Sequence, residues 1–421
     1  MQAMRDPLNA FLDVPQVPVS NGETGPLAGL GLAVKDIFDV AGYRTGCGNP
    51  QKFTETAPAT KTAPAVQLIL DAGAHFLGKT QTDEFAFSLM GQNSHFPEPV
   101  NSAAPDRVTG GSSSGSVAAV AGRLADIATG SDTGGSIRAP ASFCGLVGLR
   151  TSHGRISLEG TMPLAPSLDT FGWFAKDIET YEKVAELVLS APPSPLRGGS
   201  DGEAGRGGGG ETAAASHHKA QAKLLRLAAL DQLVLGNTEA TEYRRMLAIV
   251  TAALGEAKPA KPLTQTPDDL YWSFRKIQAR EAWANHGDWI SAHPGSLGKG
   301  VEDRFRFATT IDDQALVDAN ATRTAFRAEL HDLLCDDGIL VLPTVPGAAP
   351  LKADTPENLL AYRERALRLL CLSGLSGFPQ ITLPLGTVHG APFGVSLLGP
   401  SNSDLHLISL GKRILESNNK G

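Results

Sequence analysis

Two short clusters of glycine and serine constrain the fold of this chain most, because each one adjoins segments that must be buried. The first, residues 110–116 (GGSSSGS), runs directly into the apolar segment 117–124, and the second, residues 132–136 (DTGGS), follows the apolar segment 125–131. A flexible glycine-serine linker would not continue into apolar sequence. We therefore expect both clusters to be tight loops, the first at the start of a helix and the second between a strand and a helix.

Strand and helix patterns alternate along the chain and predict an α/β fold. In the strand expected over 27–40, Leu32 and Val34 share one face, while Ala33 and Lys35 share the other, where small neighbours could enclose the lysine. Further strands are expected at 74–77, 125–131, 145–150, 339–346 and 379–385, and helices at 62–72, 83–90, 112–124 and 137–143. Their short spacing predicts an α/β/α sandwich, in which helices cover both faces of a large mixed central β-sheet.

The whole chain, residues 1–421, is expected to form a single domain with an unusual segment in its middle. Residues 192–218 are rich in glycine, proline and serine, which predicts a flexible surface loop. His217 and His218 end this loop, and we expect them to be exposed rather than to bind a metal. Residues 219–334 show mainly helical patterns and predict a helical insertion.

Composition argues against several classes of protein. The chain is 42% hydrophobic with a net charge of −7, which argues against binding nucleic acid through a basic surface. Its four cysteines are scattered without a CxxC pair, which argues against a disulfide framework or a cysteine-based zinc site. The N-terminus lacks a signal-peptide pattern, and no stretch reaches the roughly 18 apolar residues of a membrane span. We expect a soluble, cytoplasmic protein that binds neither nucleic acid nor membrane.

Residues 73–80 (GAHFLGKT) match the phosphate-binding pattern G-x-x-x-x-G-K-[ST] letter for letter. That pattern requires a strand before the glycine-rich loop and a helix after it, so that backbone N–H groups surround the phosphates. Here a helix is expected before the motif, and the middle residues are mostly apolar and strand-like. Lys79 would therefore end a strand, and we expect no nucleotide site.

The second cluster has the composition of a loop that carries a nucleophile. Ser136 follows two glycines and is expected at the start of a helix, where backbone N–H groups lack partners. The N–H groups of Thr133, Gly134, Gly135 and Ser136 could then converge on one oxygen, as an oxyanion hole does. A plain strand-to-helix turn would account for the same residues.

A nucleophilic serine also needs a general base, and spacing alone does not identify it. His153 is the nearest histidine after Ser136, and the order of residues in a Ser-His-acid triad varies between folds. There is no G-x-S-x-G motif to support such a triad, however, and a lone histidine is more often structural.

Longer stretches of the chain resemble the amidase-signature family of hydrolases. Residues 110–150, from GGSSSGS through DTGGS to GLVGLR, are similar to the signature of that family. Residues 32–42 (LAVKDIFDVAG), 73–86, 167–177 and the C-terminal SGLSGFPQITLPLG extend the resemblance, which is weak across 192–330. The resemblance implies the amidase-signature fold for most of the chain.

The resemblance also implies a Ser-Ser-Lys triad, with Lys35 as the general base, Ser112 as the bridging residue and Ser136 as the nucleophile. It implies a cis peptide bond between Gly111 and Ser112, an acyl-enzyme intermediate and no metal or organic cofactor. A lysine is a base only when neutral, so its pKa must fall by about three units from about 10.4. Burial would supply that change, because desolvation disfavours the ammonium form.

The substrate class implied by the resemblance is a small carboxamide. Chain length and the C-terminal segment resemble indole-3-acetamide hydrolases of the plant type and their bacterial relatives, which implies an aryl- or indole-acetamide. Met90, Gln92 and Ser112 are expected to contact the substrate, and the insertion 219–334 to line its pocket. The alternatives are a ureide- or biuret-type amidase, the glutaminase subunit of a tRNA-dependent amidotransferase, and an inactive binding protein on the same fold. We expect a monomer or a homodimer.

Overall fold

The computed structural model describes residues 6–190 and 222–419 of the chain. The loop expected at 192–218, with His217 and His218, lies outside the described residues. The helices are α1 (Pro50–Glu55), α2 (Pro64–Asp71), α3 (Ser114–Ala121), α4 (Arg138–Cys144), α5 (Ile178–Ser190), α6 (Ala228–Asp231), α7 (Asn237–Leu254), α8 (Pro267–Ala292), α9 (Lys299–Arg306), α10 (Asp313–Leu334), α11 (Pro356–Ser376) and α12 (Asp404–Asn418). Within the two described ranges, no helix combines the length and the apolar character that a membrane crossing requires.

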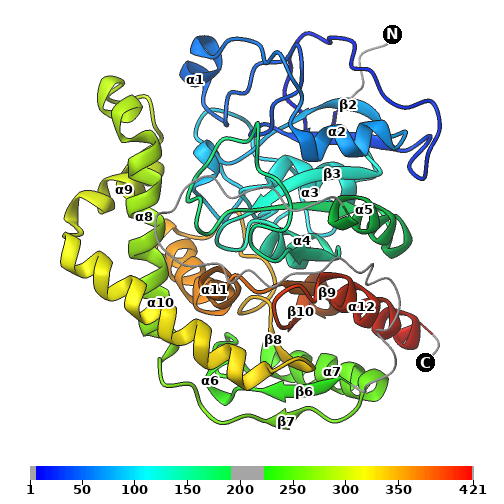
Figure 1. The fold of residues 1–421 in the computed structure, drawn as a ribbon, viewed down its shortest axis with the longest axis vertical. Helices are drawn as coiled ribbons and strands as arrows, with labels where there is room; N and C mark the ends of the chain where they lie inside the picture. Colours follow the sequence, from blue (N-terminus) through cyan, green and yellow to red (C-terminus); the bar gives the residue numbers. More distant parts are fainter. Residues whose placement is uncertain (1–5, 191–221, 420–421) are drawn as a thin grey trace, which may run out of the picture.

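The strands form two hydrogen-bonded sheets (Figure 1). They are β1 (Gly31–Lys35), β2 (His75–Thr80), β3 (Ile127–Asp132), β4 (Gly148–Arg150), β5 (Thr170–Ala175), β6 (Lys223–Arg226), β7 (Lys258–Pro259), β8 (Gly338–Pro343), β9 (Gln380–Val388) and β10 (Ala391–Leu398). The smaller sheet has the order β2-β1-β3-β5 and the larger one β4-β9-β10-β8-β6-β7. Both are mixed, since β1 runs parallel to β2 and β3, whereas β3 pairs antiparallel with β5 and β9 with β10.

Alternation along β1 places its side chains on two covered faces. Leu32 and Val34 belong to the main hydrophobic core, together with Ile69 of α2 and Tyr181 of α5. Ala33 points to the other face and packs in a second cluster with the apolar residues of α3. The two faces expected for this strand are therefore confirmed, and Lys35 lies on the α3 side.

The larger sheet is also covered on both faces. Ile381 and Leu383 of β9 pack against Gly411 of α12, while the side chain of Gln380 accepts a hydrogen bond at 2.6 Å from Arg138 of α4 on the opposite face. The expected α/β fold with mixed strands and covering helices is confirmed. Its strands are divided between two sheets because β4 meets β5 through a side chain, Thr151 Oγ1 donating to Phe171 O at 3.0 Å, and not through a backbone ladder.

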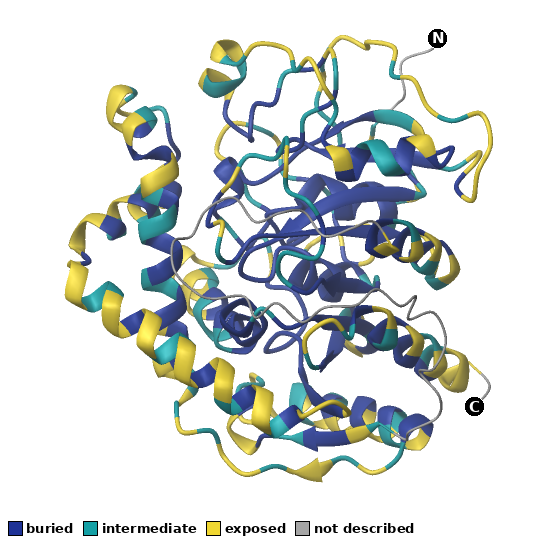
Figure 2. Ribbon diagram, in the orientation of Figure 1, coloured by how far each residue is buried: buried dark blue, intermediate teal, exposed yellow. Residues whose placement is uncertain are grey.

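Helices α8, α9 and α10 form a layer along one side of the molecule, beside α11 (Figure 1). Their outer faces are exposed and their inner faces are buried (Figure 2). Helix α8 begins with a capping box, in which Thr266 and Asp269 exchange side-chain and backbone hydrogen bonds. Phe274 and Gln278 lie on its buried side, which brings this helix toward the loop after β3.

The helix expected at 83–90 is not formed, and only a short 3₁₀ turn, Glu84–Ala86, is present there. Phe85 and Ala86 have φ angles of 49° and 55°, which an α-helix does not allow. The N–H of Phe85 donates to Cys47 O at 2.8 Å, and the N–H of Gly91 donates to the Asp83 carboxylate at 3.0 Å. These backbone groups bond to their surroundings, so the helical ladder cannot form.

The segment that resembles a phosphate-binding loop has the order of elements expected from the sequence. Helix α2 precedes it, and strand β2 contains its lysine, Lys79. The Lys79 side chain is buried and lies 3.2 Å from the carboxylate of Asp36. Its ammonium group also donates to the backbone oxygen of Phe38. The lysine is thus occupied by contacts inside the protein.

Candidate active site

Lys35 ends strand β1 and points into a pocket of hydroxyl groups. Its side chain is fully buried, at 0% exposure. The amine nitrogen lies 2.8 Å from Ser112 Oγ, 3.1 Å from Ser113 Oγ and 2.9 Å from Ser131 Oγ. The backbone N–H of Lys35 donates to Thr129 Oγ1 on β3, which fixes the end of the strand. The structure therefore brings Lys35 and Ser112 together, as the sequence predicts.

The surroundings of Lys35 favour its neutral form. Burial lowers the pKa of Lys35 from 10.5 to about 7, although the charges of Asp83, Asp132 and Asp169 act in the opposite direction. The three groups within hydrogen-bonding distance are uncharged hydroxyls. An amine in such an environment can exchange a proton near neutral pH.

The hydroxyl of Ser113 indicates how the amine is oriented. Ser113 Oγ donates to Ser131 O and accepts from Ser131 N, both at 3.4 Å. Its proton is therefore directed away from Lys35, so that Ser113 acts as an acceptor for the amine. A neutral amine that donates to Ser113 and Ser131 has its lone pair left for the hydroxyl of Ser112.

Ser112 lies in the loop before α3, and the peptide bond between Gly111 and Ser112 is cis, as the resemblance implies. The Ser112 carbonyl accepts hydrogen bonds from Asp83 N at 3.1 Å and from Thr82 Oγ1 at 2.9 Å. A Cβ atom on Gly111 would lie 2.2 Å from the Asp83 carboxylate, so only glycine fits this close approach. The loops at 82–91 and 110–113 thus hold Ser112 against the lysine.

Ser136 lies in the turn between β3 and α4, and the carboxylate of Asp132 organises this turn. Asp132 accepts hydrogen bonds from Gly135 N at 2.8 Å and Ile137 N at 3.2 Å. It also forms buried ion pairs with Arg138 at 2.9 Å and Arg150 at 3.1 Å. Burial acts to raise the pKa of Asp132, but the two arginines outweigh it and hold this pKa well below its usual range. The turn is therefore built around a permanent anion.

The four backbone N–H groups expected to form an oxyanion hole are not all free to donate to a ligand. Because the N–H of Gly135 is bonded to Asp132, Gly135 is not available as a donor, which corrects that part of the prediction. Its φ of 116°, and the 2.5 Å that would separate an added Cβ atom from the Leu370 side chain, show that the turn itself requires glycine here. Within the described part of the chain, the N–H groups of Thr133, Gly134 and Ser136 have no hydrogen-bond acceptor.

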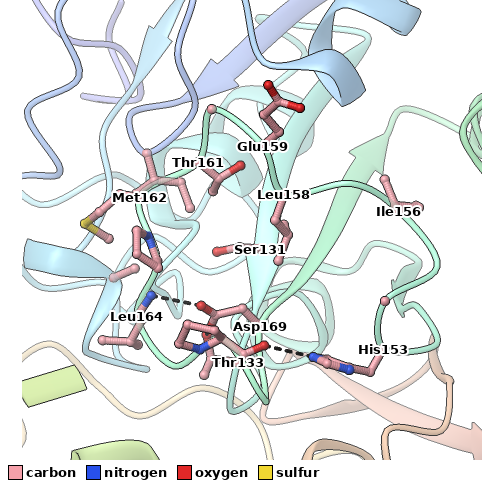
Figure 3. A pocket seen from close by; sticks show the side chains of 16 residues that line it. Ser131, Thr133, His153, Ile156, Leu158, Glu159, Thr161, Met162, Leu164 and Asp169 are labelled. Atoms are coloured by element: carbon pink, nitrogen blue, oxygen red, sulfur yellow. Dashed lines mark hydrogen bonds between the residues drawn. The ribbon is translucent and has the colours of Figure 1, made fainter. Parts of the chain in front are cut away.

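A large cavity of about 610 Å³ opens beside this cluster (Figure 3). Its walls are mainly apolar and include Ile37, Ile156, Leu158, Met162 and Leu164. Ser131, Thr133 and Asp169 line it on the side of the lysine, and the hydroxyl of Thr133 donates to Asp169. Burial raises the pKa of Asp169, which also accepts the N–H groups of Leu164 and Ala165. The cavity thus combines apolar walls with a polar end.

A second, smaller cavity lies on the other side of the same turn. Ser136, Gly134 and Thr133 line it, together with Gln278 of α8 and Arg363 of α11. Thr133 and Ala86 line both cavities, so the two spaces adjoin at these residues. The predicted nucleophile faces the smaller space, close to where the larger one ends.

Of three other residues singled out in the sequence, Met90 and Gln92 lie apart from the two cavities and His153 lines the larger one. Met90 is buried in the main hydrophobic core, and the amide of Gln92 donates to Glu98 at 2.8 Å. Among the described residues that line the two cavities, neither Met90 nor Gln92 appears. His153 lines the large cavity, where its Nε2 lies 2.9 Å from Pro166 O. It does not contact Ser136 in the described structure, which agrees with its expected structural role.

Ser113, Ser131 and Asp132 belong to the site and were missed in the sequence. Ser113 and Asp132 lie inside the two clusters, so a search for polar neighbours of the predicted triad could have found them. Ser131 contacts Lys35 only because β1 and β3 are parallel neighbours with Ala33 opposite Ala128. The amino-acid sequence alone does not reveal this strand register. Within residues 6–190 and 222–419, no group of His, Cys, Asp or Glu side chains is arranged to hold a metal ion.

Comparison with known proteins identifies relatives along nearly the whole chain. A family model described as Amidase matches residues 13–201. The chain is 37% identical to "Amidase 1" of Oryza sativa, over 98% of this chain and 96% of that protein. It is 32% identical to "Outer envelope protein 64, chloroplastic" of Arabidopsis thaliana, over 97% of this chain and 70% of that protein.

Solved structures give the same result for the fold. A crystal structure of an amidase is 29% identical, with a TM-score of 0.78 over 93% of this chain and 85% of the other. A chain described in connection with the evolutionary origins of an s-triazine catabolic enzyme is 27% identical, with a TM-score of 0.80 over 94% and 85%. The fold of this chain therefore matches that of the solved structures.

Proposed function

Because the chain belongs to the amidase family, we propose that it hydrolyses a small carboxamide to a carboxylate and ammonia through Lys35, Ser112 and Ser136. One observation carries the proposal. A fully buried lysine, with its pKa lowered to about 7, lies 2.8 Å from the hydroxyl of Ser112. An amine that is buried among hydroxyl groups forms no ion pair that would require its charged form. Its neutral form can therefore act as a general base.

The reaction proceeds in two halves. Neutral Lys35 accepts a proton from Ser112, which accepts the proton of Ser136 as Ser136 Oγ attacks the amide carbon. The N–H groups of Thr133, Gly134 and Ser136 donate to the oxyanion that forms. Ser112 then returns the proton to the leaving nitrogen, and ammonia departs. Water hydrolyses the acyl-enzyme by the same proton route in reverse.

The acyl group is expected to be apolar for the most part. The large cavity, about 610 Å³ in volume, is in the size range of small-molecule sites, and aliphatic side chains form most of its walls. These properties support an aryl- or indole-acetamide, the class that the resemblance implies. The side chains supply nucleophile, base and acid, so we propose that no metal or organic cofactor takes part. We further propose a cytoplasmic monomer or homodimer.

Two measurements on purified protein test the proposal. Wild-type enzyme should release ammonia from at least one amide in a set containing indole-3-acetamide, phenylacetamide, benzamide, biuret and glutamine. Ser136→Ala should abolish this activity, with an unchanged melting temperature. A fluorophosphonate probe should label Ser136 in the wild type, as located by peptide mass spectrometry.

The outcomes separate the proposal from its alternatives. Hydrolysis of biuret alone would favour a ureide amidase, and glutamine hydrolysis only with an added partner subunit would favour a glutaminase subunit. Substantial activity in Ser136→Ala would remove Ser136 from its role. A wild-type protein that is neither labelled nor active would be an inactive binding protein on this fold.

A further inference from the structure

The smaller cavity beside Ser136 contains an arginine that the proposed reaction does not use. Arg363 is 5% exposed and lines this cavity together with Gln278 and Ser136. Its Nε atom has no hydrogen-bond partner in the described structure, and Arg363 forms no ion pair with a described carboxylate, although the charge of Glu364 acts on it. An unpaired cation in the protein interior destabilises the folded state. Such a residue calls for a partner that the protein alone does not supply.

Other charges around Arg363 increase this need. Burial lowers the pKa of Arg363 well below its usual range, and the nearby positive charges of Arg275 and Arg304 act in the same direction. Arg304 is also largely buried and has an unpartnered Nε. Three arginines, Arg275, Arg304 and Arg363, thus lie near one another between α8, α9 and α11, although Glu364 acts on the pKa of Arg363 in the opposite direction.

Gln278 adds a second unsatisfied group to the same cavity. It is 5% exposed, and its side-chain oxygen has no hydrogen-bond partner in the described structure. Buried polar groups in proteins are almost always paired with protein, water or ligand, so this cavity wall offers one hydrogen-bond donor and one acceptor to a bound group. The cavity also meets the turn that presents Ser136 and Gly134, where the reacting carbonyl must lie.

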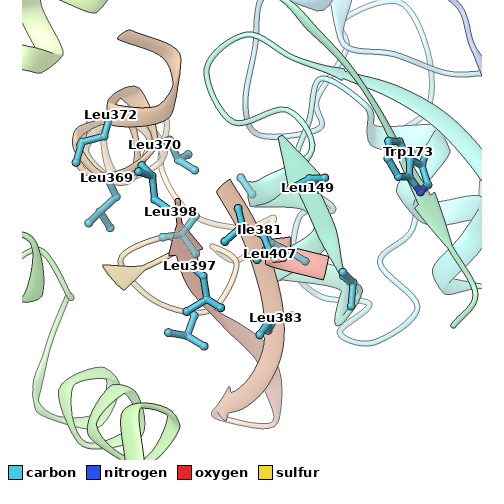
Figure 4. Packing of buried hydrophobic residues seen from close by; sticks show 14 of the residues in the cluster. Leu149, Trp173, Leu369, Leu370, Leu372, Ile381, Leu383, Leu397, Leu398 and Leu407 are labelled. Carbon is cyan, nitrogen blue, oxygen red and sulfur yellow. The ribbon is translucent and has the colours of Figure 1, made fainter. Parts of the chain in front are cut away.

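A purely structural role does not account for Arg363. Arg138, which is also fully buried, donates four hydrogen bonds to a carboxylate, a backbone oxygen and an amide oxygen. Helix α11 does not depend on a contact of Arg363 either, because Leu369, Leu370 and Leu372 anchor it in the main core (Figure 4). Apolar packing thus fixes the position of helix α11, and the guanidinium of Arg363 is available to a ligand.

We propose that Arg363, with Gln278, forms a subsite for a carboxylate on the acyl part of the substrate. The proposal rests on the proposed function, and within the class of small carboxamides it favours amides or ureides with a carboxylate near the scissile carbonyl over an unsubstituted aryl- or indole-acetamide. Arg363 donates to the carboxylate, and Gln278 accepts an N–H group of the substrate. The smaller cavity, about 10 Å³, has room for about one oxygen-sized atom, so one carboxylate oxygen enters it and the remainder of the substrate, with any aromatic ring, lies in the larger cavity.

Matched substrates test this subsite. Malonamate and succinamate carry the carboxylate, and 3-methylbutanamide and 4-methylpentanamide are uncharged counterparts of similar shape. The wild type should prefer the charged member of each pair. Arg363→Met should lower kcat/KM for the charged amides by roughly 100-fold, as expected when one partner of a buried charge pair is truncated, and leave the uncharged amides almost unchanged. The control Arg365→Met removes the same charge from α11 without touching this cavity, and it should change neither.

Thermal denaturation tests the subsite without relying on catalysis. Arg363→Met removes a buried, unpaired charge, so its melting temperature should equal or exceed that of the wild type. Malonate and succinate should raise the melting temperature of the wild type and of Ser136→Ala, but not that of Arg363→Met. If the acids stabilise a protein that hydrolyses no amide, the subsite stands and the proposed function fails. If Arg363→Met melts lower, or slows both members of a pair equally, the subsite proposal is overturned.

Discussion

Two lysines on neighbouring strands are equally buried and have opposite surroundings. Lys35 of β1 is 0% exposed and lies among the hydroxyls of Ser112, Ser113 and Ser131. Lys79 of β2 is 1% exposed and lies 3.2 Å from the carboxylate of Asp36. Burial alone therefore does not make a lysine a base. The carboxylate of Asp36 compensates the charge of Lys79. Lys35 has hydroxyl groups in place of a carboxylate, and this environment favours its neutral form.

Replacing each lysine by methionine should have the largest effects, and it tests whether the two lysines differ in role. Lys35→Met should reduce kcat by about 10²–10⁴-fold, the usual contribution of a general base, with a melting temperature close to that of the wild type. The methionine side chain is about as long as that of lysine and uncharged, so it suits a site that already favours an uncharged group. Steady-state ammonia release and thermal denaturation measure the two effects. Near-normal activity in Lys35→Met would contradict the assignment of the base.

Lys79→Met should show the opposite pattern. It leaves the Asp36 carboxylate buried and unpaired, which should lower the free energy of unfolding by about 3–5 kcal/mol. The remaining folded enzyme should keep its kcat. Urea denaturation measures the loss, and the double variant Asp36→Asn with Lys79→Met should recover part of it. A stable but inactive Lys79→Met would show that the two lysines do not differ in role as described.

A smaller effect is expected from the hydroxyl that orients Lys35. Ser113→Ala removes the acceptor at 3.1 Å from the amine while leaving Ser112 in place. We expect kcat to fall by about 10-fold, corresponding to about 1.4 kcal/mol, because the lone pair of the amine is less well aimed. KM should remain unchanged, which distinguishes positioning from binding. A 10-fold increase in KM at constant kcat would place Ser113 in the substrate pocket instead.

The sequence predicts most of the fold and the proximity of Lys35 to Ser112, but not the other partners of Lys35. Alternation in β1 correctly separates Val34 from Lys35, because side chains in a strand point to opposite faces whatever the tertiary structure. The helix expected at 83–90 is wrong because long-range backbone contacts, such as Phe85 N to Cys47 O, override local periodicity. Whether Gly135 N–H points to a ligand or to Asp132 depends on a turn geometry that the letters do not contain.

The pairing of buried charges is equally invisible in the sequence. Arg138 and Arg363 are both arginines in apolar helices, yet one pairs with Asp132 and the other lines a cavity unpaired. Only the spatial arrangement of β3, α4 and α11 distinguishes them. The composition of a segment therefore predicts whether it is buried. The role of a buried arginine depends on whether a carboxylate from another part of the chain lies next to it.

The pH dependence of kcat/KM tests the central claim most directly, since that claim is a neutral Lys35 at the start of the proton route. The lowered pKa of Lys35, about 7, predicts that kcat/KM rises with pH through about 7 and reaches a plateau above it, because only the neutral amine accepts a proton. Well below that pH, the rate should fall by about tenfold per unit. A rate that still rises through pH 10, near the pKa of an ordinary lysine, would contradict the account.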